Sequence, residues 1–196
     1  MKAWARYLVC AVVGIAGGSA LAISQVRGGF TDGMMSNGPW TTGKSFGTKD
    51  ADALTRAKVA LRGLLALPAK EAMYFTASTD SLGRPLEGRC RYAVRGETLE
   101  ARWWSLTLYD PRGYLVANRQ GVYSVGSGAF FVDGKPPTEW YVFVGPEEAK
   151  DRLEFIPTGN SERFELTLRA YHPQGTLFSN PAKVKLPTIV PVAGCQ

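Results

Sequence analysis

Histidine is almost absent from this sequence, and its scarcity removes several kinds of chemistry. The single histidine, His172, stands directly before Pro173. A metal cluster built on several imidazoles is therefore excluded. A Ser-His or Cys-His catalytic site would have to use this one residue, and its position favours a histidine at the turn that ends a strand.

Other common signatures are missing as well. No phosphate-binding loop and no dinucleotide fingerprint occurs, and Gly126-Ser127-Gly128 lacks the full spacing of a nucleophile elbow. The net charge is +6, but no run of Lys or Arg forms the basic stripe that nucleic-acid binding requires. No spacing among the acids marks a carboxylate pair for glycoside hydrolysis; the candidates are Glu71, Glu87, Asp110, Glu139, Glu154 and Glu165.

The first 25 residues have the pattern of a targeting segment. Lys2 and Arg6 precede an uncharged, largely apolar stretch from Tyr7 to Gln25, and Ala20-Leu21-Ala22 fits a small-x-small cleavage site. Residues 1–25 are thus predicted to be a signal peptide or a retained membrane anchor, with the basic end in the cytoplasm. Either alternative places the globular part outside the cytoplasm.

Residues 26–47 are rich in Gly, Ser, Thr, Asn and Asp and show no sustained period, which indicates a linker or wrapping arm. Four apolar residues suggest that part of this arm packs against the domain, since free linkers seldom carry such rings. They are Phe30, Pro39, Trp40 and Phe46.

The stretch from Ala101 to Gly128 carries the strongest structural signal. Its aromatic run from Trp103 to Tyr109 is typical of a central strand, and Asp110-Pro111-Arg112-Gly113 has each residue where a type I turn prefers it. Side chains alternate along a strand, so Trp104 and Leu106 share one face and Trp103 points to the other.

The rest of the chain adds one helix and more strands. A helix capped by Asp50 and ended by Pro68 is expected to cover a sheet. The stretches Ala72–Ala77, Gly88–Val94 and the central strand are predicted to form a meander. In the alternating stretch 164–171, Phe164, Leu166, Leu168 and Ala170 should face the core.

These patterns predict eight to ten short strands in a single domain over residues 48–196. The predicted fold is mostly β: an antiparallel β-sandwich, similar to a jelly roll, with one amphipathic helix, preceded by an N-terminal signal or anchor helix.

The central stretch resembles the core motif of the bacterial family called domain of unknown function 1214, with a W-S-L-T-x-Y-D strand, a G-Y-L-V strand, an Asn and a Y-S pair. The similarity runs from about Met73 to Pro173, and Gly38-Pro39-Trp40 is similar to the single-domain envelope branch. The resemblance implies a β-sandwich, often joined in larger relatives to a companion domain of unknown function 1254, and it implies no established activity. Two segments depart from the family pattern, at Leu153–Gly159 and at Tyr171-His172-Pro173.

The candidate ligand-binding residues are aromatic or polar residues on or near the predicted strands: Trp104, Tyr109, Asn118, Tyr123 and Arg169. The favoured function is a non-enzymatic envelope module that binds a small molecule, a glycan or a protein, or has a structural role. No catalytic residue, metal or cofactor is expected, and the inner membrane is a partner only if the first segment is retained. The alternative is a hydrolase of an ester or glycan that uses Ser124, Ser127 or a carboxylate pair.

The cysteines suggest a cross-link. Cys10 lies in the targeting segment, which leaves Cys90 and Cys195 as a pair in an oxidising compartment. A disulfide would tether the last residues of the chain, where Pro187 and Pro191 keep the backbone extended. The alternative is two unpaired thiols.

Overall fold

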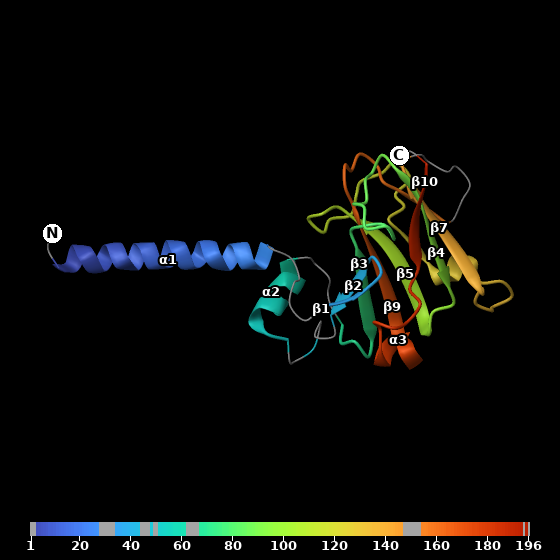
Figure 1. Cartoon of the computed structure of the whole chain (residues 1–196), viewed down its shortest axis with the longest axis horizontal. Coiled ribbons are helices and arrows are strands. Elements are labelled where there is room, and N and C mark those ends of the chain that lie inside the picture. The colour runs from blue at the N-terminus through green and yellow to red at the C-terminus, as the bar shows by residue number, and fades with distance from the viewer. Residues whose placement is uncertain are drawn as a thin grey trace.

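The computed structural model describes residues 3–27, 34–43, 48, 51–61, 67–146, 154–193 and 195. Two β-sheets pack face to face, and a long helix extends away from them (Figure 1). The fold is mostly β and sandwich-like, which confirms the predicted class.

The larger sheet has six strands in the order β1 (Met34–Asn37), β2 (Trp40–Gly43), β3 (Ala72–Ala77), β9 (Glu165–Pro173), β5 (Ala101–Tyr109) and β6 (Ser124–Gly126). The smaller sheet has four strands, β10 (Thr188–Ala193), β4 (Arg91–Glu97), β7 (Glu139–Gly145) and β8 (Phe155–Pro157). The helices are α1 (Ala3–Arg27), α2 (Ala53–Leu61) and α3 (Gly175–Ser179), with a 3-10 turn η1 (Ser127–Phe130).

The predicted meander is wrong. Strands β3 and β5 both pair with β9 in the six-stranded sheet, whereas β4 pairs with β7 and β10 in the other sheet. The chain therefore crosses between the layers twice where a hairpin was expected, because alternation shows which face a residue takes but not which strand is its neighbour. The sheets are also not wholly antiparallel, since β7 and β8 run parallel.

The faces of the strands were predicted correctly. On β5, Trp104, Leu106 and Leu108 are buried in the core between the sheets. On the other side of the same strand Trp103 is 41% exposed. The stretch that ends in β9 likewise buries Phe164, Leu166, Leu168 and Ala170 in the core.

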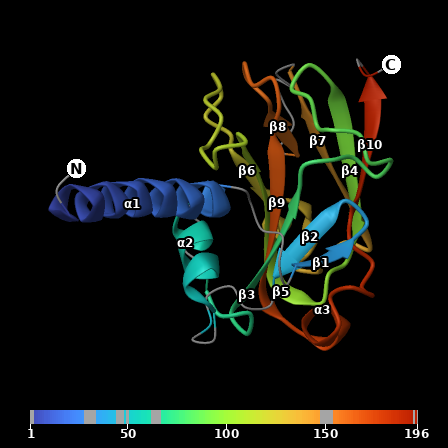
Figure 2. The same cartoon turned by 60° about the vertical axis from the view of Figure 1, so that its left-hand side comes forward.

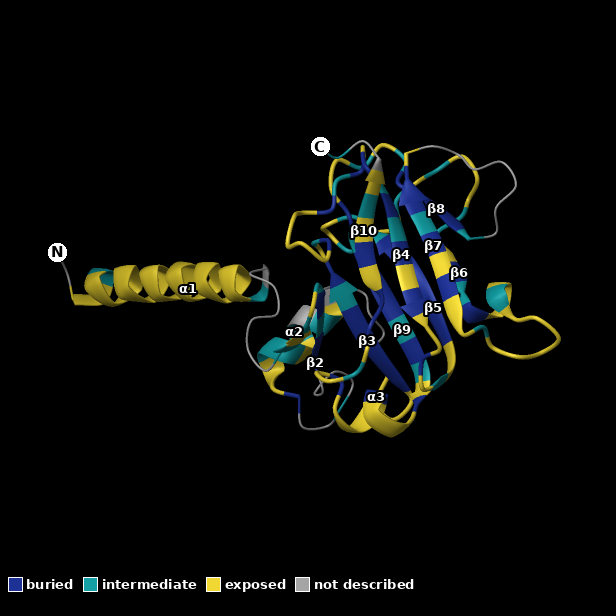
Figure 3. Cartoon of the chain, turned by 45° about the vertical axis from the view of Figure 1, so that its right-hand side comes forward, coloured by how far each residue is buried: buried dark blue, intermediate teal, exposed yellow. Residues whose placement is uncertain are grey.

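Helix α1 is apolar and almost entirely exposed (Figure 3). Its residues Ala3–Val26 are long and apolar enough to cross a membrane, and a signal sequence meets the same criteria. The helix could therefore be a signal or an anchor, as the sequence predicts.

Helix α2 is described over Ala53–Leu61, and the expected cap Asp50 lies outside the described residues. Asp52 directly precedes this range and accepts hydrogen bonds from the Thr55 amide at 2.9 Å and the Thr55 hydroxyl at 2.6 Å, as an N-cap residue does. Arg56 donates from Nε to the carbonyl of Ala51 at 2.8 Å.

Part of the predicted arm is an edge hairpin of the six-stranded sheet. Strands β1 and β2 lie beside β3, as Figure 2 shows. The Trp40 side chain is buried, and its Nε1 donates to the Pro187 carbonyl at 2.6 Å. Asn37 donates from Nδ2 to the carbonyls of Pro181 and Val184. The hairpin is thereby bound to the segment that precedes β10, while Phe30 and Phe46 lie outside the described residues.

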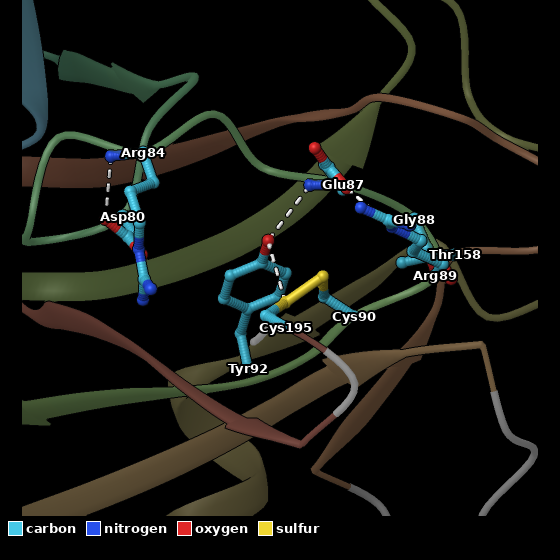
Figure 4. The surroundings of a disulfide bond; sticks show 9 residues. All are labelled: Asp80, Arg84, Glu87, Gly88, Arg89, Cys90, Tyr92, Thr158 and Cys195. Carbon is cyan, nitrogen blue, oxygen red and sulfur yellow. Dashed lines mark hydrogen bonds and ion pairs between the residues drawn. A yellow bond between two sulfur atoms is a disulfide. The ribbon is translucent and has the colours of Figure 1, made fainter.

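The structure contains the expected disulfide between Cys90 and Cys195, whose Cα atoms are 5.3 Å apart (Figure 4). Cys90 is buried at the start of β4, and Cys195 follows the edge strand β10. The Tyr92 hydroxyl lies 3.6 Å from the Cys195 Sγ and accepts a hydrogen bond from the Glu87 amide at 3.0 Å. The bond thus fastens the end of the edge strand to its neighbour.

Two turns, one beginning at Asp80 and the other at Asp110, have the same hydrogen-bond pattern. In each, aspartate Oδ1 accepts from the amides two and four residues later, all at 2.9 Å, and Oδ2 accepts from an arginine Nε at 2.9 Å. The fourth residue is a glycine with positive φ, 81° at Gly83 and 88° at Gly113, where a side chain would be strained. A repeated D-x-x-G motif therefore builds both reversals.

These turns predict a loss of stability in acid. Burial alone would raise the pKa of Asp80, but the amides of Arg84 and Leu82 and the Arg84 guanidinium outweigh it and hold the pKa below its usual value. The pKa of Asp110 is lowered in the same way, against burial, by its bonds to Tyr114 and Arg112. A carboxyl group whose pKa is lower in the folded than in the unfolded chain stabilises the fold at pH values above its unfolded pKa, near 4. That contribution is lost as the pH falls through the folded pKa.

We therefore expect the free energy of unfolding, measured in urea, to fall between about pH 4 and pH 2. In the double variant Asp80→Asn, Asp110→Asn, each turn keeps one side-chain oxygen to accept from the two backbone amides, loses the acceptor for the arginine Nε, and no longer titrates. The variant is therefore less stable near neutral pH, but its acid-dependent loss should be smaller. An equal loss in the parent and the variant would show that these carboxylates do not contribute.

Candidate functional site

The residues expected to bind a ligand do not all lie together. Trp104 is in the core, 5% exposed, with its ring 4.1 Å from the Trp140 ring and 5.7 Å from the Phe130 ring. Its indole is therefore occupied by packing and does not form part of a surface site.

Tyr109 and Arg169 are brought into direct contact. Arg169 Nη2 donates to the Tyr109 hydroxyl at 2.7 Å, and Nη1 donates to Thr107 Oγ1 at 3.2 Å. The guanidinium carbon lies 5.3 Å from the centre of the Tyr109 ring and 5.8 Å from that of Tyr74. Two tyrosine rings thus hold the cation by cation–π contact as well as by hydrogen bonds.

This cluster lies on the surface of the six-stranded sheet that points away from the four-stranded one, called here the outer face. Strand register places Tyr74 opposite Arg169 and Arg169 opposite Ser105. Residues that pair across neighbouring strands form a row on this face. The next row towards Tyr109 consists of hydroxyl residues from five strands, namely Thr41, Thr76, Thr167, Thr107 and Ser124. Thr107 and Thr167 are buried, and the Thr41 hydroxyl donates to the Thr76 carbonyl at 3.0 Å, so Ser124 is the exposed member of this polar row.

An aromatic pair lies in the row on the other side of Arg169. The rings of Trp103 and Tyr171 are 5.1 Å apart and inclined at 45°. The Trp103 indole lies over Gly126 of β6, where an added Cβ would come within 2.6 Å of the ring. Gly126 therefore lets the indole lie close against the sheet while 41% of the residue remains exposed.

Arg169 differs from the comparable arginine of the other sheet. On the outer surface of the four-stranded sheet, Arg95 lies 5.5 Å from the Tyr141 ring and binds both Glu139 oxygens, at 2.9 and 3.1 Å. Arg169 is more buried than Arg95, yet within the described residues no carboxylate contacts its guanidinium. Glu165, the acid on the same face of β9, lies two rows away, opposite Tyr109.

Asn118 and Tyr123 lie in the loop between β5 and β6. The Asn118 side chain bonds the carbonyls of Val116 and Val122 and the amide of Val122, so it fixes the loop. It also lines an open hollow of about 790 Å³, with Arg119 and Asn160 among the other lining residues. Tyr123 is half-buried, and its carbonyl accepts from the Leu108 amide at 3.1 Å. Among the described residues no hydrogen bond, ion pair or ring contact joins either residue to the Arg169 cluster, and Asn118 belongs to a separate surface.

The groups considered for catalysis lie apart. The His172 ring faces Glu71, with Nδ1 3.5 Å from a carboxylate oxygen, and both side chains are about half exposed. Ser127 is buried, and its Oγ accepts from the Trp104 amide at 3.3 Å. Ser124 is at the exposed edge strand β6, opposite Thr107. In the described part of the chain, no three His, Cys, Asp or Glu side chains form a group that could hold a metal ion.

The sequence interpretation did not single out Trp103, Tyr74 or Thr107 as site residues. The sequence did contain a signal for Trp103, because Trp103 shares a strand face with the polar Ser105 and Thr107, whereas the apolar Leu106 and Leu108 lie on the opposite face. Tyr74 had no such signal, since β3 buries both of its faces and alternation cannot separate them.

The fold and this face define a β-sandwich domain with an N-terminal apolar helix and a polar and aromatic sheet surface. The chain belongs to the family described as protein of unknown function DUF1214, whose family model matches residues 71–175. No curated protein matches the chain.

A solved structure is similar in fold. The VPA0106 protein from Vibrio parahaemolyticus aligns with a TM-score of 0.60 at 22% identity, over 95% of this chain and 45% of that one. The chain thus spans less than half of that protein's length, and the likeness shows the fold alone. An uncharacterised protein from Burkholderia cenocepacia aligns over 64% of this chain and 30% of that one, with a TM-score of 0.39 at 11% identity.

Proposed function

We propose that this protein is a non-enzymatic binding module of the bacterial envelope, exposed on the periplasmic side. The exposed apolar helix α1 supports export or anchoring, and the disulfide supports an oxidising compartment. The inner membrane is a partner if α1 is retained. The ligand is a small molecule, a glycan or an envelope protein.

The composition of the outer face is the observation that carries this proposal. The partly exposed Arg169 guanidinium and Tyr171 phenol, with the exposed Trp103 indole, are groups that orient and hold a ligand. Glu165 is the carboxylate that the described strands place on this face, whereas glycoside hydrolysis commonly requires two. Ser127 is engaged with the backbone, and among the described residues no hydrogen bond joins His172 to Ser124 or Ser127, so the alternative of a serine hydrolase has no support from these groups.

The test has one part for location and one for binding. Alkaline phosphatase fused after residue 195 should be active in bacteria, because that enzyme folds only outside the cytoplasm. The full chain, purified from the envelope fraction in mild detergent, should be stabilised against heat by at least one member of a panel of cell-wall and lipopolysaccharide fragments.

The panel member should be recovered unchanged after incubation, as checked by mass spectrometry. Conversion to a smaller product would overturn the non-enzymatic proposal in favour of a hydrolase. An inactive fusion would overturn the location, and the absence of any stabilisation would overturn binding to this panel and leave a structural role.

A further inference from the structure

We propose that the outer face binds an acidic saccharide, with the sugar ring against Trp103 and Tyr171 and the acid group on Arg169. This inference rests on the proposed binding function and names its ligand class. Three observations carry it: the state of the Arg169 charge, the exposed ring pair, and their spacing along the strands.

The charge of Arg169 is incompletely balanced. A guanidinium has five N–H donors, and the structure uses two of them, towards Thr107 and Tyr109. Both acceptors are neutral hydroxyls, and no carboxylate contacts the group within the described residues. A partly buried cation is costly unless it is paired with an anion, so the remaining donors suit a carboxylate or phosphate group from a ligand.

The contrast with Arg95 strengthens this step. Arg95 also lies over a tyrosine ring, but it is paired with Glu139 and stands in the open. Two arginines with similar aromatic neighbours thus differ in their counter-charge. Among the described residues a carboxylate pairs with the exposed Arg95, and none contacts the more buried Arg169.

The ring pair supplies the second contact. Trp103 is 41% exposed although it packs on Gly126 and Tyr171, so part of the indole is open to a ligand. Exposed indole and phenol rings offer a flat apolar surface with polar edges, which matches the apolar C–H face and the hydroxyls of a sugar ring.

The spacing joins the two contacts. Tyr171 is two residues from Arg169 on β9, and residues two apart on one strand face are separated by about 7 Å. Trp103 is directly opposite Tyr171, and Ser105 is directly opposite Arg169. One sugar unit with its acid substituent can therefore contact the Arg169 row and the Trp103 row at the same time. A bare anion would contact only Arg169, and a neutral sugar would contact only the rings.

The test compares trigalacturonate with its methyl ester, which keeps the rings but removes the charges, and with acetate as a bare anion. Binding to the full chain in mild detergent is measured by calorimetry at constant ionic strength. Trigalacturonate should bind more tightly than the other two probes. Arg169→Gln and Trp103→Leu should each weaken that binding by about tenfold or more.

Matched controls lie on the other sheet. Arg95→Gln and Tyr141→Leu make the same chemical changes on the outer surface of that sheet and should leave the affinity unchanged. Gly126→Ala should weaken binding without altering any proposed contact residue, because the added methyl displaces the Trp103 ring. The melting temperature shows whether Arg169→Gln folds, and Arg169→Lys replaces it if it does not. Arg169→Lys keeps the positive charge but should also weaken binding, since lysine lacks the planar guanidinium that binds a carboxylate through two hydrogen bonds.

Each other result overturns the inference. Equal binding of the methyl ester would remove the role of the acid group, and equal binding of acetate would remove the role of the ring. Equal weakening by Arg95→Gln and Arg169→Gln would indicate nonspecific charge attraction. If trigalacturonate does not bind but a wall fragment stabilises the protein, this inference fails and the proposed function stands; if neither binds, both fail.

Discussion

Replacing Cys90 and Cys195 together by alanine is expected to lower the free energy of unfolding by about 4 to 5 kcal/mol. The two residues are 105 positions apart, so the disulfide closes a long loop and restricts the unfolded chain strongly. The bond also fastens the end of the edge strand β10 to β4. Urea denaturation of the oxidised parent and the double variant measures the difference.

Cys10→Ala is the matched control for this experiment. Cys10 is an exposed free cysteine in α1, so its replacement should leave the urea midpoint unchanged. Alkylation without reduction, followed by mass spectrometry, provides a direct check. Labelling of both Cys90 and Cys195 in protein taken from the envelope would contradict the bond.

Truncation of Trp104 or Leu106 to alanine is the other change with a large expected effect. Each should cost on the order of 2 to 5 kcal/mol, because both side chains are buried in the core and their removal leaves a cavity. The Trp104 ring also loses its contacts with Trp140 and Phe130. Thermal or urea unfolding of the single variants gives the values.

Trp103→Ala provides the comparison within the same strand. It removes an equal number of atoms from the opposite face, where the residue is 41% exposed, so the loss of stability should be clearly smaller. If Trp103→Ala cost as much as Trp104→Ala, the register of β5 would be incorrect. Unchanged melting temperatures for both Trp104→Ala and Leu106→Ala would have the same meaning.

Local patterns in this sequence predict local structure well. The alternation in β5 and β9 predicts which residues enter the core, and the residue types from Asp110 to Gly113 predict a reversal that the structure contains. Both results depend on interactions between residues a few positions apart. The pairing of strands depends on contacts between distant segments, and the predicted meander failed for that reason.

The same limit applies to the outer face. Tyr109 and Arg169 could each be named from the sequence, but the contact between them spans 60 positions and exists only because β5 and β9 are neighbours. That no carboxylate of the described residues contacts Arg169 is still less visible in a sequence. It depends on where every nearby acid lies in three dimensions, and Glu165, only four residues away, is two rows removed from it.

The position of β9 has a consequence for the order in which the domain can be assembled. β9 lies between β3 and β5, so the six-stranded sheet consists of two halves with no backbone ladder between them until residues 165–173 are in place. A chain made from its N-terminus therefore cannot complete this sheet before β9 has been synthesised, and it does so through contacts of long sequence separation that form slowly. Strand β10 and Cys195 come after β9 in the chain, so the disulfide to Cys90 can form only after every strand of the six-stranded sheet has been made.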